Sequence, residues 1–90
     1  MRNSIKIELF YTLTCPNCQV MKKMIDDVLT KFPGQFEFKP INATMPLGMS
    51  RSIKLGIHSV PTLLINNEIV FKGVPTRQEL IEKLNKYIKN

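Results

Sequence analysis

Two cysteines, Cys15 and Cys18, are the residues whose type and spacing best suit chemistry. They are the only cysteines of the chain, and two residues, Pro16 and Asn17, separate them. An apolar, strand-like run precedes the pair and a helix-like run follows it. The first sulfur is therefore expected at a helix N-terminus, where outward-pointing N–H groups favour a thiolate. The pattern predicts that Cys15 is a nucleophilic thiolate and that Cys18 is its resolving partner.

Pro16 and Asn17 fill the interval between the two sulfurs. Pro16 suits the first helical turn, because its missing N–H has no intrahelical partner to lose and its φ is already helical. Asn17 is neutral and adds no charge beside the thiolate. Two intervening residues place Cys18 one helical turn after Cys15, within reach of its sulfur. The pair can therefore alternate between dithiol and disulfide.

Length and composition indicate a single domain over residues 1–90, with a small core drawn from a hydrophobic content of 43%. No apolar run approaches the roughly 20 residues that span a bilayer. Lys6 and Glu8 interrupt the first apolar stretch, which does not resemble a signal peptide. We therefore expect a cytoplasmic protein. In that reducing compartment, two cysteines are more typical of catalysis or metal binding than of a structural disulfide.

The net charge of +6 and the pI near 9.6 raise the question of an acidic or nucleic-acid partner. The basic residues are scattered along the chain, and aromatic residues do not alternate with them as in a single-strand binding platform. The pattern favours a solvated, solubilising surface. We expect neither nucleic acid nor a membrane as a partner.

The elements that must position the cysteines begin with a strand over residues 4–11. It has apolar side chains on both faces, which is typical of a central strand. A helical stripe of apolar residues then runs through residues 19–32, until Pro33 and Gly34 end it. Residues 35–42 indicate a second strand. Pro40 removes a hydrogen-bond donor from it, so we expect this strand at a sheet edge.

Residues 43–55 give the weakest pattern, and the structure of the segment from Met45 to Leu55 stays open. Pro46 could begin a helix, with Ile53 and Leu55 supplying its buried side and Gly56 ending it. Beyond it, residues 63–65 and 68–72 predict two strands.

Two short signals define the last part of the chain. Asn66 and Asn67 predict a two-residue hairpin turn, because asparagine tolerates positive φ. Thr76, with Glu79 three residues later, predicts a capping box at the start of a final helix. The resulting order, β-α-β-α-β-β-α, predicts an α/β fold with one four-stranded mixed sheet and helices on both faces. Its first strand-helix-strand unit should be a right-handed parallel crossover.

At this point the chain resembles the thioredoxin superfamily, and within it the small, glutaredoxin-sized thioredoxins of archaeal type with a Cys-Pro-x-Cys site. The resemblance runs from about Ile5 to Ile88. It rests on three stretches: residues 7–10 with the Cys-Pro-Asn-Cys site, residues 56–63 with Val-Pro-Thr, and residues 73–77. A lone CxxC is weakly specific, whereas a CxxC after the first strand together with a later Val-Pro-Thr is strongly specific.

The resemblance implies the thioredoxin fold and a protein-disulfide reductase whose only redox group is the Cys15–Cys18 pair. It also implies a cis peptide bond before Pro61, with this proline against the sulfurs and the backbone of Val60 pairing with a substrate strand. The implied partners are disulfide-containing target proteins and an electron donor, either a thioredoxin-reductase-like flavoenzyme or a small thiol. We expect a monomer that needs no further cofactor and no metal.

This sequence also departs from its relatives. Leu9 stands where many longer thioredoxins have a buried aspartate, which leaves the proton acceptor for Cys18 open. Glu8, together with Lys39, is a candidate for this role. Glutaredoxins follow their last strand with Gly-Gly and an acidic pair that grips glutathione, whereas this chain has Gly-Val-Pro-Thr at residues 73–76. A glutaredoxin-like, glutathione-dependent enzyme is therefore disfavoured, but the small size keeps it as an alternative.

Two further alternatives come from other classes of protein. A metal site would need ligands beyond two thiolates, and His58 is the only other strong ligand near the site. In a non-catalytic binding module, the docking surface could be lined by Met21, Met24, Met45 and Met49, although the helical spacing of Met21 and Met24 is more typical of core packing. A Cys15→Ser variant distinguishes a binding module from an enzyme. An enzyme would lose disulfide reduction, whereas a binding module would still bind its partner.

Overall fold

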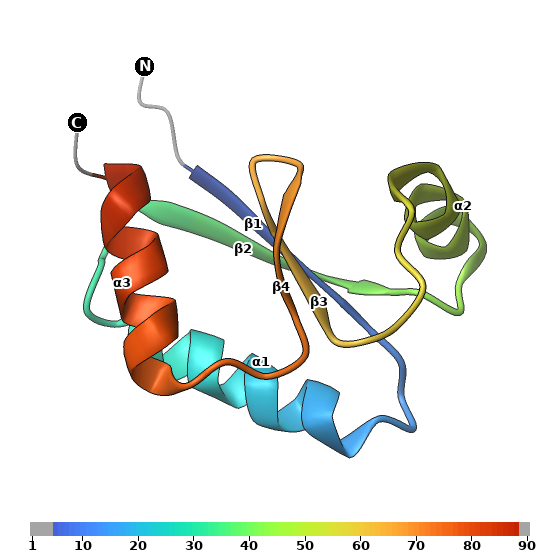
Figure 1. Cartoon of the computed structure of the whole chain (residues 1–90), viewed down its shortest axis with the longest axis horizontal. Coiled ribbons are helices and arrows are strands. Elements are labelled where there is room, and N and C mark those ends of the chain that lie inside the picture. Colours follow the sequence, from blue (N-terminus) through green and yellow to red (C-terminus); the bar gives the residue numbers. More distant parts are fainter. Residues whose placement is uncertain (1–4, 89–90) are drawn as a thin grey trace.

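The computed structural model describes residues 5–88, and its elements follow the predicted order (Figure 1). They are β1 (Ile5–Tyr11), α1 (Pro16–Leu29), β2 (Phe36–Asn42), α2 (Pro46–Leu55), β3 (Thr62–Ile65), β4 (Glu68–Lys72) and α3 (Arg77–Ile88). Ser4, which the sequence placed in the first strand, lies outside the described residues.

The four strands form one mixed sheet in the order β2-β1-β3-β4. β1 runs parallel to β2 and antiparallel to β3, and β4 returns antiparallel to β3. β1 is therefore a central strand, as its two apolar faces predicted. β2 is an edge strand, which agrees with Pro40, because a residue without an N–H is tolerated at an edge.

The two faces of the sheet carry different helices. Ile7 and Leu9 of β1 belong to the main hydrophobic cluster with α1 and α3. Glu8 and Phe10 point to the other face, because successive side chains of a strand alternate. There both of them meet Arg51 of α2. The predicted thioredoxin fold, with helices on both faces, is confirmed.

Two predicted helix details were wrong. α1 ends at Leu29 rather than Phe32, and the Thr30 hydroxyl donates 2.7 Å to the carbonyl of Asp27 at this end. In α2 the side chain of Ile53 is 72% exposed. The reason is Gly48, which lies so close to β2 that an added Cβ would be 2.1 Å from the Asn42 carbonyl oxygen.

The C-terminal signals were right. Asn66 and Asn67 both adopt positive φ, at 51° and 69°, and join β3 to β4. At the start of α3 the Thr76 hydroxyl accepts the Glu79 N–H at 3.0 Å. The Glu79 carboxylate accepts the Thr76 N–H at 2.9 Å, which completes the capping box.

Candidate active site

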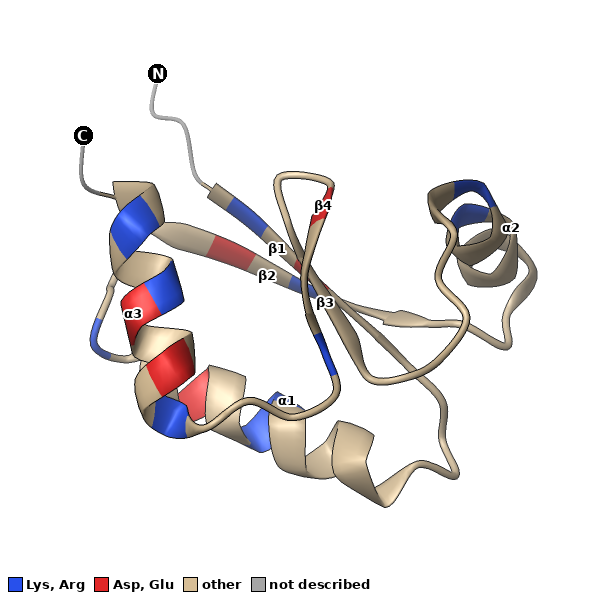
Figure 2. Ribbon diagram, in the orientation of Figure 1, with Lys and Arg blue, Asp and Glu red and all other residues tan. Residues whose placement is uncertain are grey.

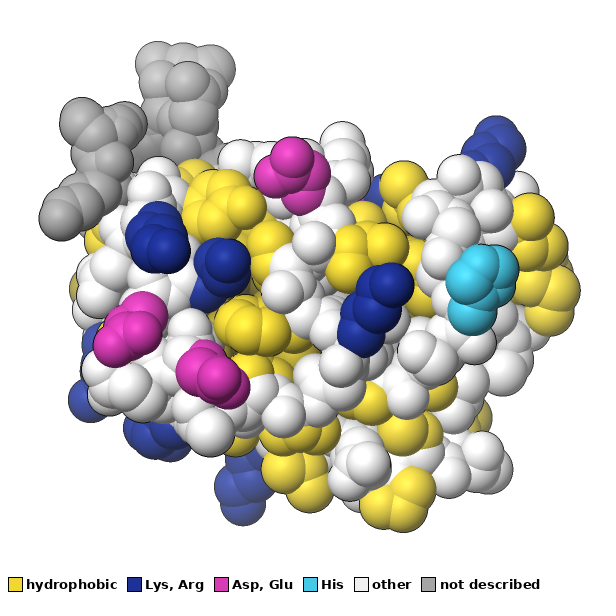
Figure 3. Space-filling model, viewed as in Figure 1, with side chains coloured by type: hydrophobic (Ala, Val, Ile, Leu, Met, Phe, Trp, Pro, Cys, Tyr) yellow, Lys and Arg dark blue, Asp and Glu magenta, His cyan; other side chains and the backbone are white. Residues whose placement is uncertain are grey.

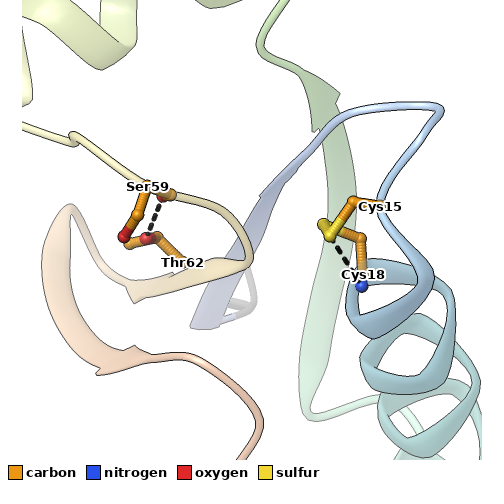
Figure 4. The surroundings of a disulfide bond; sticks show 4 residues. All are labelled: Cys15, Cys18, Ser59 and Thr62. Atoms are coloured by element: carbon orange, nitrogen blue, oxygen red, sulfur yellow. Dashed lines mark hydrogen bonds between the residues drawn. A yellow bond between two sulfur atoms is a disulfide. The ribbon is translucent and has the colours of Figure 1, made fainter.

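Cys15 is the residue that immediately precedes α1, and its extended backbone (φ −107°, ψ 104°) turns the chain into the helix. Its Sγ accepts the backbone N–H of Cys18 at 3.1 Å (Figure 4). The sulfur thus occupies the position of a helix N-cap, facing the unsatisfied N–H groups and the positive end of the helix dipole. Both features stabilise negative charge on the Cys15 sulfur.

The two cysteines form a disulfide with a Cα–Cα separation of 5.2 Å. Their exposure differs. Cys15 is partly exposed, whereas Cys18 is only 2% exposed. A large disulfide substrate can therefore approach the first sulfur but not the second. This asymmetry suits a pair in which one thiolate attacks an external disulfide and the other acts only within the molecule.

Pro16 and Asn17 are the first two residues of α1, and both are exposed. Pro16 occupies the position at which the absent N–H costs nothing, as predicted. Asn17 lies between the two cysteines on the first turn, so its side chain can alter the electrostatic environment of the pair without disturbing the core.

The loop that carries Val60 and Pro61 ends where β3 begins, and the peptide bond between these two residues is cis. Pro61 is buried and Val60 is half-buried. Thr62, the first residue of β3, lies opposite Phe10, near the end of β1 that leads toward Cys15. The fold therefore brings the Val60–Pro61 loop and the cysteines to the same end of the sheet (Figure 4).

A hydrogen bond across this loop was missed by the sequence analysis. The Thr62 hydroxyl, in a residue only 1% exposed, donates to the Ser59 carbonyl at 2.8 Å and ties the loop together on both sides of Pro61 (Figure 4). The available signal was a threonine directly after the proline, because a threonine hydroxyl often bonds a nearby backbone group.

A pocket of about 220 Å³ lies beside the loop, between α2 and the turn that leads to α1. Its walls include Thr12, Ser52, His58 and Val60. His58 is thus a loop residue that borders this pocket. Among residues 5–88, no group of three His, Cys, Asp or Glu side chains is arranged to hold a metal.

Glu8 is not placed to take the proton of Cys18. It points to the α2 face of the sheet, whereas α1, which carries Cys18, covers the opposite face. Its carboxylate is 4% exposed and forms an ion pair with the Arg51 guanidinium. The hydrogen bond from Arg51 to Glu8 raises the pKa of Arg51, against the lowering effect of its own partial burial. No local sequence pattern indicates this pair, because 43 positions separate the two residues.

Comparisons with known proteins agree with this geometry. The family described as thioredoxin domain matches residues 4–85. A thioredoxin from Methanocaldococcus jannaschii is 33% identical over 84 residues, which cover 93% of this chain and 96% of that protein. A probable thioredoxin from Methanothermobacter thermautotrophicus is 30% identical over 81 residues, covering 90% of this chain and 93% of that protein.

Among solved structures, chloroplastic thioredoxin z superposes with a TM-score of 0.83 over 99% of this chain and 82% of its own. The sequence identity is 17%, so this likeness shows the fold alone. Within residues 5–88, none of the helices has the length and apolar character needed to cross a membrane. The thioredoxin relatives do not favour the glutaredoxin alternative. With its neighbouring Cys15 and Cys18, the chain is a dithiol–disulfide oxidoreductase and belongs to the thioredoxin family.

Proposed function

We propose that Cys15 is the attacking thiolate and Cys18 the resolving thiol of an enzyme that reduces disulfides in other proteins. One observation carries the proposal: the partly exposed Cys15 sulfur accepts an N–H at the α1 N-terminus, while Cys18 is 2% exposed. The first sulfur is accessible and its thiolate is stabilised. The second is shielded from everything except its neighbour.

The reaction then proceeds in two exchanges. The Cys15 thiolate attacks one sulfur of the target disulfide, forms a mixed disulfide and releases the other target sulfur as a thiolate, which takes up a proton. Cys18 attacks the Cys15 sulfur, and the Cys18 proton ends on the target sulfur that departs. The mixed disulfide breaks, the second target thiol is released, and the Cys15–Cys18 disulfide remains. Two electrons pass to the target, and a donor must return them.

Four neighbours shape this site in the proposal. Pro16 fixes the first turn of α1, and Asn17 keeps the surroundings of the sulfurs uncharged. Val60 offers backbone groups to an extended target strand, and Pro61 positions that segment beside the sulfurs. The arrangement of the Val60–Pro61 loop at the same end of the sheet as Cys15 supports these roles.

The enzyme acts, in this proposal, as a monomeric single domain over residues 1–90 in the cytoplasm. Thioredoxins generally act on disulfide-containing proteins and are reduced again by a reductase. Here the electrons come from a thioredoxin-reductase-like enzyme or from a small thiol. The Cys15–Cys18 pair is the only redox group required, and no metal takes part.

The test uses the Cys15→Ser and Cys18→Ser variants with a disulfide-containing protein substrate; dithiothreitol is the donor in the turnover assay and is left out of the adduct assay. Cys15→Ser should lose substrate reduction and form no adduct. Cys18→Ser should accumulate a covalent mixed disulfide through Cys15, visible by mass spectrometry and removed by excess dithiothreitol. An adduct that forms through Cys18 in the Cys15→Ser variant would reverse the assigned roles. Full reduction by Cys15→Ser would overturn the proposal.

A further inference from the structure

The outer side of α2 is an exposed apolar surface that the disulfide chemistry does not use. Met49 and Ile53 are four residues apart, so their side chains form a stripe along the helix, and Met45 directly precedes the helix as its N-cap residue. Leu47 lies about 120° around the helix axis from Ile53, on the far side of Ser50 and Lys54. The exposed fractions are 57% for Met45, 47% for Met49, 72% for Ile53 and 85% for Leu47.

The helix does not need this surface in order to pack on the sheet. Its inward side consists of Gly48 and Ser52, both buried, and the Arg51 side chain anchors it to Glu8 of β1. Met49 and Ile53 are neighbours on the free side of a ten-residue helix, and exposed apolar side chains that lie together mark an interaction site more often than a scattered residue does. Figure 3 shows hydrophobic side chains gathered at the α2 end of the molecule.

The charges around this surface have one sign. No aspartate or glutamate occurs between Glu37 and Glu68, a stretch that contains Lys39, Arg51 and Lys54. On the ribbon of α2 the charged positions are all basic (Figure 2). Glu8, the carboxylate beneath the helix, is 4% exposed and already paired with Arg51. The face therefore offers apolar contact and positive potential, without an acidic side chain of its own.

These charges indicate which kind of molecule can bind to the outer side of α2. A second copy of the chain would bring a net charge of +6 and the same basic helix against this face, which opposes association. A protein segment with apolar side chains on one side and carboxylates on the other complements it. The flexible methionines Met45 and Met49 can adjust to such a segment, because their thioether side chains adopt many shapes.

We propose that the outer side of α2 is a docking site for an acidic amphipathic segment of a partner protein. The apolar side chains of that segment cover Met49 and Ile53, and its carboxylates meet Lys54 and the exposed part of Arg51. The site lies on a different element from the cysteines, so it goes beyond the disulfide exchange. It would select which proteins stay close to Cys15, and it does not require Cys15 to be reduced.

The experiment follows the ¹⁵N amide signals of the full chain during titration with a synthetic peptide. The probe is a helical peptide of about 16 residues, long enough to fold partly on its own, with leucine along one side and glutamate along the other. The comparison peptide carries lysine in place of every glutamate. We expect the acidic peptide to shift signals of residues 45–55, less so at high salt, and the basic peptide to leave them unchanged.

A double variant, Ile53→Ser with Lys54→Glu, should weaken binding of the acidic peptide about tenfold, because it removes one apolar contact and one charge pair. Lys86→Glu is the matched control for charge: it changes the net charge by the same amount on the exposed side of α3 and should have a small effect. Equal weakening by Lys86→Glu would mean that overall charge alone attracts the peptide, which overturns the proposal.

Three other outcomes would also contradict the proposal that α2 binds an acidic segment. Shifts that fall on α1 or α3 rather than α2 would place the peptide elsewhere. Concentration-dependent shifts of residues 45–55 in the absence of peptide, with dimers in sedimentation, would assign the face to a second copy. Binding to phosphatidylglycerol vesicles through α2, without any response to the acidic peptide, would assign it to a lipid surface.

Discussion

Arg51 of α2 forms a two-point ion pair with the buried carboxylate of Glu8 in β1; its Nη2 lies 3.1 Å from Oε1, and its Nη1 bonds Oε2. The guanidinium also lies 5.6 Å from the centre of the Phe10 ring. The pair is the principal charged contact between α2 and the sheet within residues 5–88, and it neutralises a carboxylate that is 4% exposed.

Replacing only one residue of the Glu8–Arg51 pair should therefore lower the free energy of unfolding more than replacing both. Arg51→Ala leaves Glu8 buried without a counter-ion, and we expect a loss of about 2–3 kcal/mol in the free energy of unfolding, at the lower end because the guanidinium is partly solvated. The double variant Glu8→Leu with Arg51→Met should stay within about 1 kcal/mol of the native protein. Urea unfolding measures both. An equal loss in the two variants would show that the pair itself stabilises the fold.

This pair also shows where sequence reasoning stops. Local signals predicted the capping box at Thr76 and the Asn66-Asn67 turn, because the residues that make each of them are neighbours in the chain. The Cys-Pro-Asn-Cys spacing predicted the position of Cys15 at a helix start for the same reason. Whether Glu8 is exposed or buried depends on Arg51, which the fold brings to it from another element.

Burial on α2 could not be predicted for a related reason. The apolar pattern assigned Ile53 to the buried side, but the side that packs is set by how closely the helix can approach β2. Gly48 permits a short approach there, so the small residues face inward and the large apolar ones remain outside. A hydrophobic pattern shows which residues are apolar. It does not show whether they pack on the sheet, and in a short helix at a sheet edge they can remain exposed.

Gly48→Ala tests that approach directly. The new Cβ would lie 2.1 Å from the Asn42 carbonyl oxygen, and a backbone atom cannot move aside as a flexible side chain can. We expect a loss of about 1–3 kcal/mol in the free energy of unfolding, with α2 displaced from β2. Ser50→Ala, at an exposed position of the same helix, is the matched control and should be neutral or slightly stabilising. A stable Gly48→Ala protein with unshifted α2 amide signals would contradict the close contact.

The Thr62–Ser59 hydrogen bond should matter for both stability and activity. Thr62→Val keeps the side-chain shape but removes the donor, leaving the Ser59 carbonyl without this bond. We expect a loss of about 1 kcal/mol in stability. We also expect kcat/KM for protein-disulfide reduction to fall severalfold, because the loop that presents Val60 loses the hydrogen bond that holds it in place. Thr62→Ser retains the hydroxyl and should recover most of the activity; failure of this recovery would point to packing rather than the hydrogen bond.

Alkaline pH should weaken the fold through Tyr87. Burial raises the pKa of Tyr87, and the charge of Glu68 together with a hydrogen bond to it adds to the rise. A raised pKa means that the folded state holds the phenol proton more tightly than the unfolded state does. The stabilising contribution is thus complete below the ordinary tyrosine pKa of about 10 and is lost as pH rises through the folded value.

The Tyr87→Phe variant has no phenol to ionise. The stability difference between the native protein and this variant should therefore shrink as pH rises above about 10, measured by urea unfolding at several pH values. Glu68→Gln serves as a second check, because it removes the nearby charge and should move the Tyr87 titration, followed by ultraviolet absorbance, toward lower pH. A difference that stays constant with pH would rule out Tyr87 as the source.

Asn17 should set the reduction potential of the pair. A histidine at this position would carry positive charge beside the Cys15 thiolate when protonated and so stabilise the reduced form. Stabilising the reduced form makes the couple more oxidising. We therefore expect the Asn17→His variant to have a higher potential than the native protein, by about 30 mV for each 1.4 kcal/mol gained by the dithiol state.

The direction of the change in reduction potential and its dependence on pH together show whether the histidine charge causes it. Histidine ordinarily titrates near pH 6.5, so the rise should be larger at pH 6 than at pH 8, as measured by equilibration in thiol buffers. Asn17→Gln changes the side chain without adding charge and should leave the potential near the native value. If Asn17→His has the native potential at both pH values, the charge at position 17 does not tune the Cys15–Cys18 couple, and the potential must be set by the helix terminus and the loop around Pro61.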